Sequence, residues 1–131
     1  MTTNKLFALG SSVVVIVALL AGIILIGSPM DERLRRLDQQ RINDLRMLSN
    51  IISQSYRVEG RLPDDLAELV NGLQLSQIPT DPETQAQYGY ELTANDSFRL
   101  CAQFSAPSQQ DEFWSHTAGQ HCFSLTAGSR R

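Results

Sequence analysis

The most constraining feature of this chain is a run of 22 residues without a charged side chain, from Leu6 to Gly27. An α-helix rises about 1.5 Å per residue, so this run spans roughly 30 Å, the thickness of the hydrocarbon core of a bilayer. A secretory signal has a shorter apolar core and small residues at its cleavage site, and the Ile-Gly-Ser-Pro sequence at residues 26–29 lacks that pattern. The sequence therefore predicts an uncleaved transmembrane anchor over residues 1–27, in contact with the lipid bilayer through Leu6 to Gly27.

Two indicators of membrane orientation disagree. Lys5 precedes the anchor and more basic residues follow it, so the positive-inside rule places the C-terminal domain in the cytoplasm. The basic residues that follow are Arg33, Arg35, Arg36 and Arg41. In contrast, the placement of the only cysteines, Cys101 and Cys122, favours a disulfide bond and therefore an oxidising compartment. Because acidic residues are interleaved with the arginines and reduce their weight, we favour a domain outside the cytoplasm.

A long amphipathic helix is predicted directly after the anchor. Ser28 is a suitable N-cap and Pro29 suits the first helical position. Apolar residues then recur every three or four positions to about Arg57, which is the period of a helix with one apolar side. These residues are Leu34, Leu37, Leu45, Leu48, Ile52 and Tyr56. The apolar side has three interpretations: the spine of the domain, a coiled-coil dimer seam, or a surface lying on anionic lipid. The mixed charge argues against lipid, and we favour the spine.

The rest of the chain predicts a short helix followed by a small sheet. Acids at Asp64 and Asp65 start the second helix, and Asn71-Gly72 ends it. After a turn-rich connection at residues 79–84, apolar and polar residues alternate over Tyr88 to Thr93 and Phe98 to Phe104, with a third strand around His121 to Leu125. The predicted fold class is α+β: an N-terminal transmembrane helix, and a long amphipathic helix packed on a three-stranded antiparallel sheet. Residues 28–127 form the soluble domain, and residues 128–131 form a disordered tail.

The alternation of the strands predicts where the two cysteines point. Cys101 and Cys122 are out of phase with the apolar residues of their strands, so both thiols are expected on the sheet face away from the long helix. A disulfide bond across about 20 residues contributes roughly 3 kcal/mol to stability. The alternatives are two unpaired thiols or a zinc site formed by Cys101, His116, His121 and Cys122, for which no close ligand pair is present. We favour the disulfide bond.

A long connection between the second and third strands carries the only tryptophan. This segment, Ser105 to Gln120, includes the adjacent aromatic residues Phe113 and Trp114. Long loops without regular structure are often functional, so Trp114 and Phe113 are candidate partner-binding residues. The alternative, which we favour, is that both side chains fold back and cover the core.

Composition and motifs argue against catalysis and against nucleic-acid binding. A net charge of −3 with 11 basic residues provides no basic patch for nucleic acid. The sequence has no phosphate-binding loop, no dinucleotide-binding motif, no nucleophile elbow and no zinc-protease motif. Asp81 and Glu83 are weak candidates for calcium ligands, because no full ligand set accompanies them. We therefore predict no enzyme activity and no cofactor.

Several turn and core residues resemble those of a known family. They are Asp44-Leu45 through Tyr56, the turn Gly60-x-Leu62-Pro63, and Asp81-Pro82 followed by Tyr88-x-Tyr90. In these the chain resembles type IV pilin-like proteins, in particular the major pseudopilin of type II secretion. It is also similar to short single-pass bacterial proteins of unassigned function, which carry a Gly-x-Leu-Pro turn, Asp-Pro-x-Thr, Leu-Cys-Ala-x-Phe and a closing Cys-Phe. One departure is that pilins carry a glutamate within the apolar helix, whereas this chain has no acid before Asp31.

The resemblance implies a noncatalytic, pilin-like domain anchored in the bacterial inner membrane. Such a domain makes protein–protein contacts in the cell envelope, with an unidentified envelope protein or by self-association. Two other hypotheses stay open. One is a metal- or redox-responsive membrane sensor that uses Cys101, Cys122 and the two histidines. The other is a cytoplasm-facing adaptor whose long helix dimerises as a coiled coil.

Overall fold

The computed structural model describes residues 2–26, 28–71, 75–108 and 113–128. Three predicted features lie partly outside these residues: the end of the anchor at Gly27, the helix stop at Gly72 and most of the C-terminal tail. The chain divides into two compact units, Met1–Arg33 and Leu34–Arg131.

The first unit contains α1 (Thr2–Ile26), which is apolar on all sides. Its large aliphatic side chains are exposed along the described part of the helix, as at Leu9 and Ile24. Within the described chain, one N-terminal helical stretch is long and apolar enough to cross a membrane by length and composition. A helix of this length that is hydrophobic all round is of the kind that can insert in a membrane.

The long helix α2 (Pro29–Glu59) begins where the sequence predicts. The Ser28 hydroxyl accepts a hydrogen bond from the Met30 amide at 3.3 Å, and the Ser28 carbonyl accepts one from the Glu32 amide at 3.3 Å. The helix runs two residues past Arg57 to Glu59 and stops at Gly60, the residue that the sequence predicts to end it. Gly60, with a φ of 73°, adopts the left-handed conformation that favours glycine after a helix.

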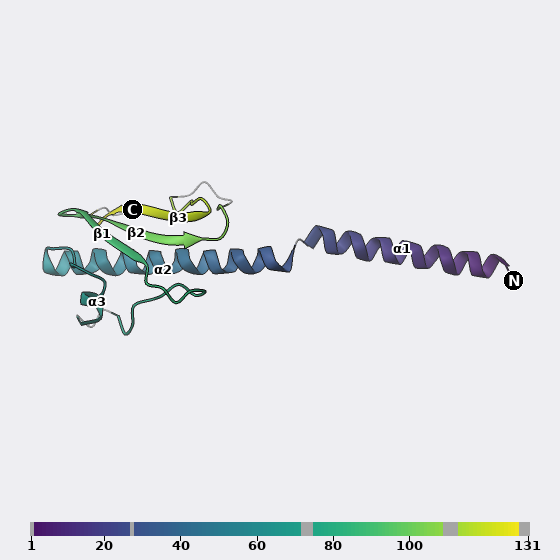
Figure 1. Ribbon diagram of the computed structural model, residues 1–131, viewed down its shortest axis with the longest axis horizontal. Coiled ribbons are helices and arrows are strands. Elements are labelled where there is room, and N and C mark those ends of the chain that lie inside the picture. Colours follow the sequence, from purple (N-terminus) through teal and green to yellow (C-terminus); the bar gives the residue numbers. More distant parts are fainter. Residues whose placement is uncertain (1, 27, 72–74, 109–112, 129–131) are drawn as a thin grey trace. The chain divides into compact units, whose positions relative to one another are not determined.

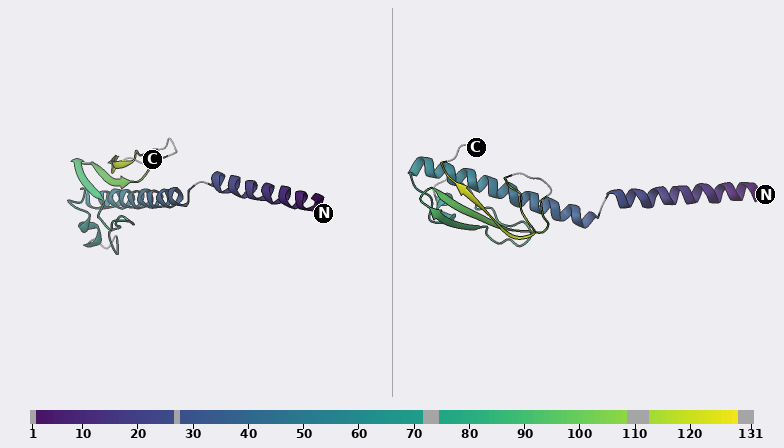
Figure 2. Two further views of the ribbon diagram at one scale, coloured as in Figure 1. Left: turned by 45° about the vertical axis from the view of Figure 1, so that its right-hand side comes forward. Right: turned by 90° about the horizontal axis from the view of Figure 1, so that it is seen from above.

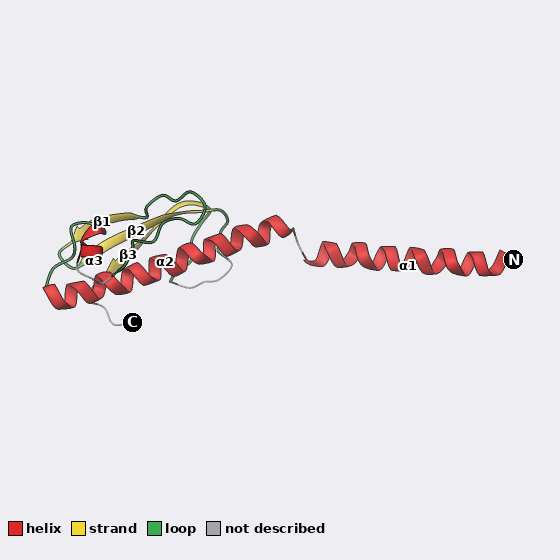
Figure 3. Ribbon diagram, turned by 90° about the horizontal axis from the view of Figure 1, so that it is seen from below, coloured by secondary structure: helices red, strands yellow, loops and turns green. Residues whose placement is uncertain are grey.

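The second unit is built from α2 and one antiparallel sheet with the strand order β1-β2-β3. The strands are β1 (Gly89–Ala94), β2 (Ser97–Phe104) and β3 (Gly119–Thr126). Figures 1 and 3 show the sheet lying along one side of α2, and the views in Figure 2 agree. The predicted α+β fold class is therefore confirmed.

The core lies between the apolar side of α2 and the inner face of the sheet. The Leu45, Leu48 and Ile52 side chains of α2 are fully buried, together with Phe98 and Leu100 of β2. This confirms that the apolar side of α2 is the spine of the domain. It also means that these three side chains are covered by the sheet, so they do not form an open coiled-coil seam.

One local prediction, the extent of the short helix, was wrong. The short helix α3 covers only Ala67–Asn71, because the Asp65 carboxylate caps the Glu68 amide at 3.1 Å and the helix starts after that residue. Leu92, which alternates with polar residues in the first predicted strand, is the register partner of the core residue Phe98 and so shares its sheet face, although Leu92 is 47% exposed on the edge strand β1.

Candidate functional site

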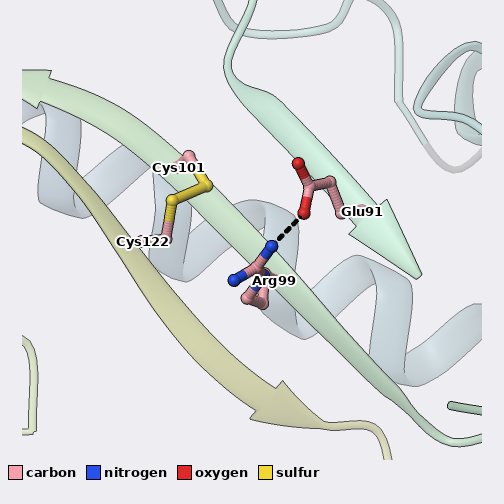
Figure 4. The surroundings of a disulfide bond; sticks show 4 residues. All are labelled: Glu91, Arg99, Cys101 and Cys122. Carbon is pink, nitrogen blue, oxygen red and sulfur yellow. Dashed lines mark hydrogen bonds and ion pairs between the residues drawn. A yellow bond between two sulfur atoms is a disulfide. The ribbon is translucent and has the colours of Figure 1, made fainter. Parts of the chain in front are cut away.

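The predicted disulfide bond joins the middle of two neighbouring strands. Cys101 of β2 and Cys122 of β3 are direct partners in the antiparallel register, and their sulfur atoms are 2.02 Å apart. Figure 4 shows the bond on the same sheet face as the ion pair between Arg99 and Glu91. This is the outer face, because the side chains that alternate with Cys101 in β2 belong to the core. The parity argument from the sequence therefore describes the sheet correctly.

Glycine at position 89 allows β1 to lie close to this disulfide bond. Gly89 is the register partner of Cys101, and a Cβ atom built at Gly89 would be 3.0 Å from the Cβ atom of Cys101. Cys101 is only 7% exposed, yet it is not a member of the core cluster. Its sulfur is thus shielded by the neighbouring strand, whereas Cys122 is half-buried.

The structure does not bring together the four residues weighed as a zinc site. The two sulfur atoms are bonded to each other, so neither is a thiolate ligand. His121 is the register partner of Ala102, which lies on the core side of β2, and the His121 ring contacts Phe123 with 4.8 Å between centroids. His116 stacks on Phe104 at 3.7 Å. No group of three or more potential metal ligands occurs among the described residues.

The two aromatic residues of the long connection have different surroundings. Trp114 packs against the core, with its ring 4.8 Å from that of Phe123 and the Arg46 guanidinium 5.8 Å from its centroid. Phe113 is 54% exposed and meets Trp114 edge to face at 5.6 Å. Trp114 therefore covers the core, whereas Phe113 does not.

Arg41, which from the sequence is only one of the charges near the anchor, donates five hydrogen bonds. Arg41 lies on the core side of α2 and is 2% exposed. Its five N–H groups donate to oxygens from three separate segments. These bonds reach Asp81 from Nε at 2.5 Å and from Nη2 at 3.1 Å, Glu83 from Nη2 at 2.9 Å, and both Asp38 at 2.8 Å and Ser105 at 3.0 Å from Nη1. We call Arg41, Asp38, Asp81, Glu83 and Ser105 the arginine cluster.

The two buried acids of the arginine cluster are themselves fully engaged. Asp38 accepts hydrogen bonds from the Ser105 amide at 2.9 Å and from the Ala106 amide at 2.9 Å, which fixes the end of β2 to α2. Asp81 accepts hydrogen bonds from the amides of the following turn, at 2.9 Å each. It is therefore an anchor for its own loop.

The pKa values of Arg41 and Asp81 are both shifted in the direction that favours the charged form. Burial alone raises the pKa of Asp81, but hydrogen bonds from Arg41 and from the Thr84 and Glu83 amides outweigh it and hold that pKa well below its usual range. Hydrogen bonding to Asp81 raises the pKa of Arg41 against the opposing effect of burial. Asp81 and Arg41 therefore stay charged across the physiological pH range.

Two tyrosines of the resemblance motif tie the start of the sheet to the helical part. The Tyr88 hydroxyl donates to Asp44 of α2 at 2.8 Å, and the Tyr90 hydroxyl donates to the carbonyl of Pro63 at 2.8 Å. Burial, with added repulsion from Asp64 and Glu68, raises the pKa of Tyr90 to about 12. Several residues that carry the family resemblance are thus in direct contact with one another.

Comparison with protein-family models, with curated proteins and with solved structures gives no significant match for this chain. The observed architecture is a long apolar N-terminal helix, followed by an amphipathic helix and a small antiparallel sheet with a disulfide bond. The buried charged side chains among the described residues are bonded to one another. This arrangement suits a rigid scaffold.

Proposed function

We propose that this protein is a noncatalytic, membrane-anchored, pilin-like domain that makes protein–protein contacts in the bacterial cell envelope. The observation that carries the proposal is the Cys101–Cys122 disulfide bond in a domain that follows an apolar helix of membrane-spanning length. Disulfide bonds persist in oxidising compartments, so the domain belongs outside the cytoplasm. The anchor then belongs to the inner membrane, with its N-terminal end toward the cytoplasm.

The arginine cluster supports a scaffolding role. Arg41 is desolvated and paired with acids from a distant loop, which holds the loop, the sheet and α2 in one arrangement. Groups that serve catalysis commonly lie in a cleft, have a pKa shifted from its ordinary value, and are accessible to the substrate. Here all the N–H donors of Arg41 bond to groups of the same domain. Contacts with other proteins are therefore left to the outer surface of the domain.

Labelling of thiols tests the compartment. Spheroplasts of a bacterial host that produces the full chain are treated with a membrane-impermeant maleimide, before and after an impermeant reductant. We expect labelling only after reduction, because the chain has no free cysteine. The Cys101→Ala variant is the control, since it leaves Cys122 as a half-buried thiol that labels without reductant. Thiols that are free and labelled only after lysis would overturn the proposal.

A photoreactive phenylalanine analogue at Phe113 tests for a partner. Phe113 is exposed, and the same analogue at Thr93, an exposed residue of β1, is the matched control. We expect a discrete cross-linked product from position 113 in the native envelope. Equal and diffuse labelling from both positions would contradict a specific contact there.

A further inference from the structure

The two edges of the sheet are built differently. The strand order is β1-β2-β3, so β1 and β3 each have one long side that is not paired within the sheet (Figure 1). β1 has six residues, carries Glu91, and shifts its register between Leu92 and Ala94. Natural proteins use short length, charged side chains and irregular register to protect an edge strand from pairing with another chain. The β1 edge is therefore protected.

The other edge strand, β3, lacks each of these features. Its eight residues pair with β2 one by one, without a shift in register. Its sequence, Gly-Gln-His-Cys-Phe-Ser-Leu-Thr, contains no acidic residue, no lysine, no arginine and no proline. Among the described residues, no backbone hydrogen bond from another segment reaches its outer edge. β3 thus presents a long and regular edge that an extended chain can join.

The backbone groups that point outward from β3 follow from the ladder between β2 and β3. In an antiparallel ladder, hydrogen-bonded and non-hydrogen-bonded pairs alternate, and the Cα atoms of the second kind are closer, about 4.5 Å apart. The Cα atoms of Cys101 and Cys122 are 4.0 Å apart, so this is a non-hydrogen-bonded pair. The bond from the Ala127 amide to the Asp96 carbonyl, at 2.8 Å, has the matching parity. The residues whose N–H and C=O groups point outward are therefore Gln120, Cys122, Ser124 and Thr126.

The side chains along this edge define what an added strand must carry. On the outer sheet face, Gln120, Ser124 and Thr126 are polar, uncharged and exposed. On the inner face, the half-buried Leu125 packs against the core beside the buried Phe123. An added strand therefore needs apolar residues on its inner side, alternating with uncharged polar residues on its outer side.

An exposed aromatic ring lies next to the inner side of β3. Trp114 packs on Phe123 with 4.8 Å between ring centroids, and Phe113, which is 54% exposed, meets Trp114 edge to face. A residue of the added strand that faces Phe123 is placed toward these rings. Aromatic residues are enriched where proteins bind one another, so Phe113 adds a side-chain contact to the backbone contacts of β3.

We infer that the outer edge of β3 binds an extended segment of another envelope protein, which adds a strand to the sheet. In this segment, apolar and uncharged polar residues alternate over about eight positions, the length of β3. The inference rests on the proposed function, because it names the surface and the kind of partner for the protein–protein contacts proposed there. The Cys101–Cys122 bond holds β3 on β2 and so keeps the edge in place for the incoming strand.

A free segment suits this edge better than a second copy of the chain. In an antiparallel pair of β3 strands, each copy would bring its own Trp114 to the inner side of Phe123. It would also bring Arg46, whose guanidinium lies 5.8 Å from the centroid of the Trp114 ring. Two bulky aromatic side chains and two like charges would then gather at one junction. A segment without a folded domain brings neither.

Binding of a synthetic peptide to the full chain in detergent tests the inference. The probe is a capped, fluorescent peptide of about eight residues in which valine and threonine alternate, and empty micelles are the blank. We expect saturable binding below about 1 mM by fluorescence anisotropy. Only alternate amides of an added strand face β3, so N-methylation of either the valines or the threonines abolishes binding, whereas N-methylation of the other set preserves it. No binding above the blank, or equal effects of the two methylated sets, overturns the inference.

Two variants at Ser124 test whether the peptide lies on β3. Ser124→Pro removes an outward N–H group that is not bonded to β2, and an edge strand tolerates proline at such a position. We expect about tenfold weaker peptide binding for Ser124→Pro than for Ser124→Ala, which keeps the N–H group. Circular dichroism and an intact disulfide bond check that both variants are folded. Equal binding by the two folded variants overturns the inference.

Amide hydrogen exchange of the unsubstituted chain provides a measurement that does not depend on a variant. In the free chain, the four outward-pointing amides of β3 exchange fast, and the amides between them, which bond to β2, exchange slowly. The bound peptide slows the first set and leaves the second set unchanged. Fast exchange of the first set in the presence of saturating peptide overturns the inference. A dimer of the free chain that dissociates in Ser124→Pro also overturns it, because the edge then binds a second copy.

The outcomes separate this inference from the proposed function. Peptide binding is measured in detergent and does not depend on the compartment. Failure of peptide binding overturns the inference alone when thiol labelling places an intact disulfide bond outside the cytoplasm. Free native thiols on the cytoplasmic side overturn the proposed function instead.

Discussion

The disulfide bond and the arginine cluster both join parts of the chain that are distant in sequence, but they join different kinds of neighbours. Cys101 and Cys122 connect β2 and β3, which are already paired over their whole lengths by a regular register. The arginine cluster connects α2, the loop at Asp81 and the end of β2, segments that belong to different elements. The disulfide bond therefore reinforces an existing contact, whereas the cluster creates one. Loss of the cluster is expected to disturb more of the domain.

The largest effect is expected from Arg41→Met. This change removes the cation and leaves two buried carboxylates unpaired, which costs about 3–5 kcal/mol of unfolding free energy. Urea unfolding of the full chain in detergent measures it. Arg99→Met is the matched control, because Arg99 pairs with Glu91 on the exposed sheet face, where an ion pair contributes at most about 1 kcal/mol. Equal losses in the two variants would show that the cluster does not join the elements as described.

A somewhat smaller effect is expected from the double change Cys101→Ala and Cys122→Ala. Removing a disulfide bond that closes a loop of this size costs about 3 kcal/mol in the chain-entropy model. We expect the far-ultraviolet circular dichroism at low denaturant to stay unchanged, since the register of β2 and β3 does not depend on the bond. A greater loss of unfolding free energy than in Arg41→Met would show that the disulfide bond stabilises the domain more than the arginine cluster does.

Acid sharpens the comparison, because only one of the two regions titrates. The pKa of Asp81 is lower in the folded protein than in the unfolded chain, so its contribution is present above the unfolded value of about 3.9 and is lost as the pH falls below it. We expect unfolding free energy to fall between pH 5 and pH 3. In Arg41→Met this dependence weakens or reverses, since a buried unpaired acid is stabilised by protonation. Urea titrations of both proteins at the two pH values distinguish these cases.

The smallest effects are expected from the tyrosine variants Tyr88→Phe and Tyr90→Phe. Tyr88→Phe removes the hydrogen bond from the Tyr88 hydroxyl to the Asp44 carboxylate but keeps the ring, so a loss of about 1.5–3 kcal/mol, toward the lower end, is expected. Tyr90→Phe is a useful companion, because its hydroxyl donates to a neutral carbonyl and the expected loss is about 1 kcal/mol. Thermal unfolding by circular dichroism resolves such differences. An unchanged unfolding temperature in both variants would show that the two tyrosine hydrogen bonds do not stabilise the position of β1.

Features that follow from the helical or strand periodicity can be predicted from the sequence, whereas contacts with residues distant in the chain cannot. Alternation placed both cysteines on the outer sheet face, and helical spacing identified the buried side of α2. Arg41 was missed because an arginine in a charged segment is usually solvated, and two of its three acids lie about forty residues further on. One signal was present: Arg41 precedes Ile42 in the buried phase of the helix, with Asp38 three residues earlier. The late start of α3 was missed because adjacent aspartates offer two alternative caps.

The absence of a side chain at Gly89 has a consequence for how the sheet assembles. Aligning β1 one position too far along β2 would bring Tyr88 or Tyr90 opposite Cys101, where even a methyl group would be crowded. Such a slip would also move the tyrosine hydroxyls away from their acceptors and turn the strand over. The disulfide bond and the glycine together therefore favour one register of the hairpin and disfavour a shift by one residue.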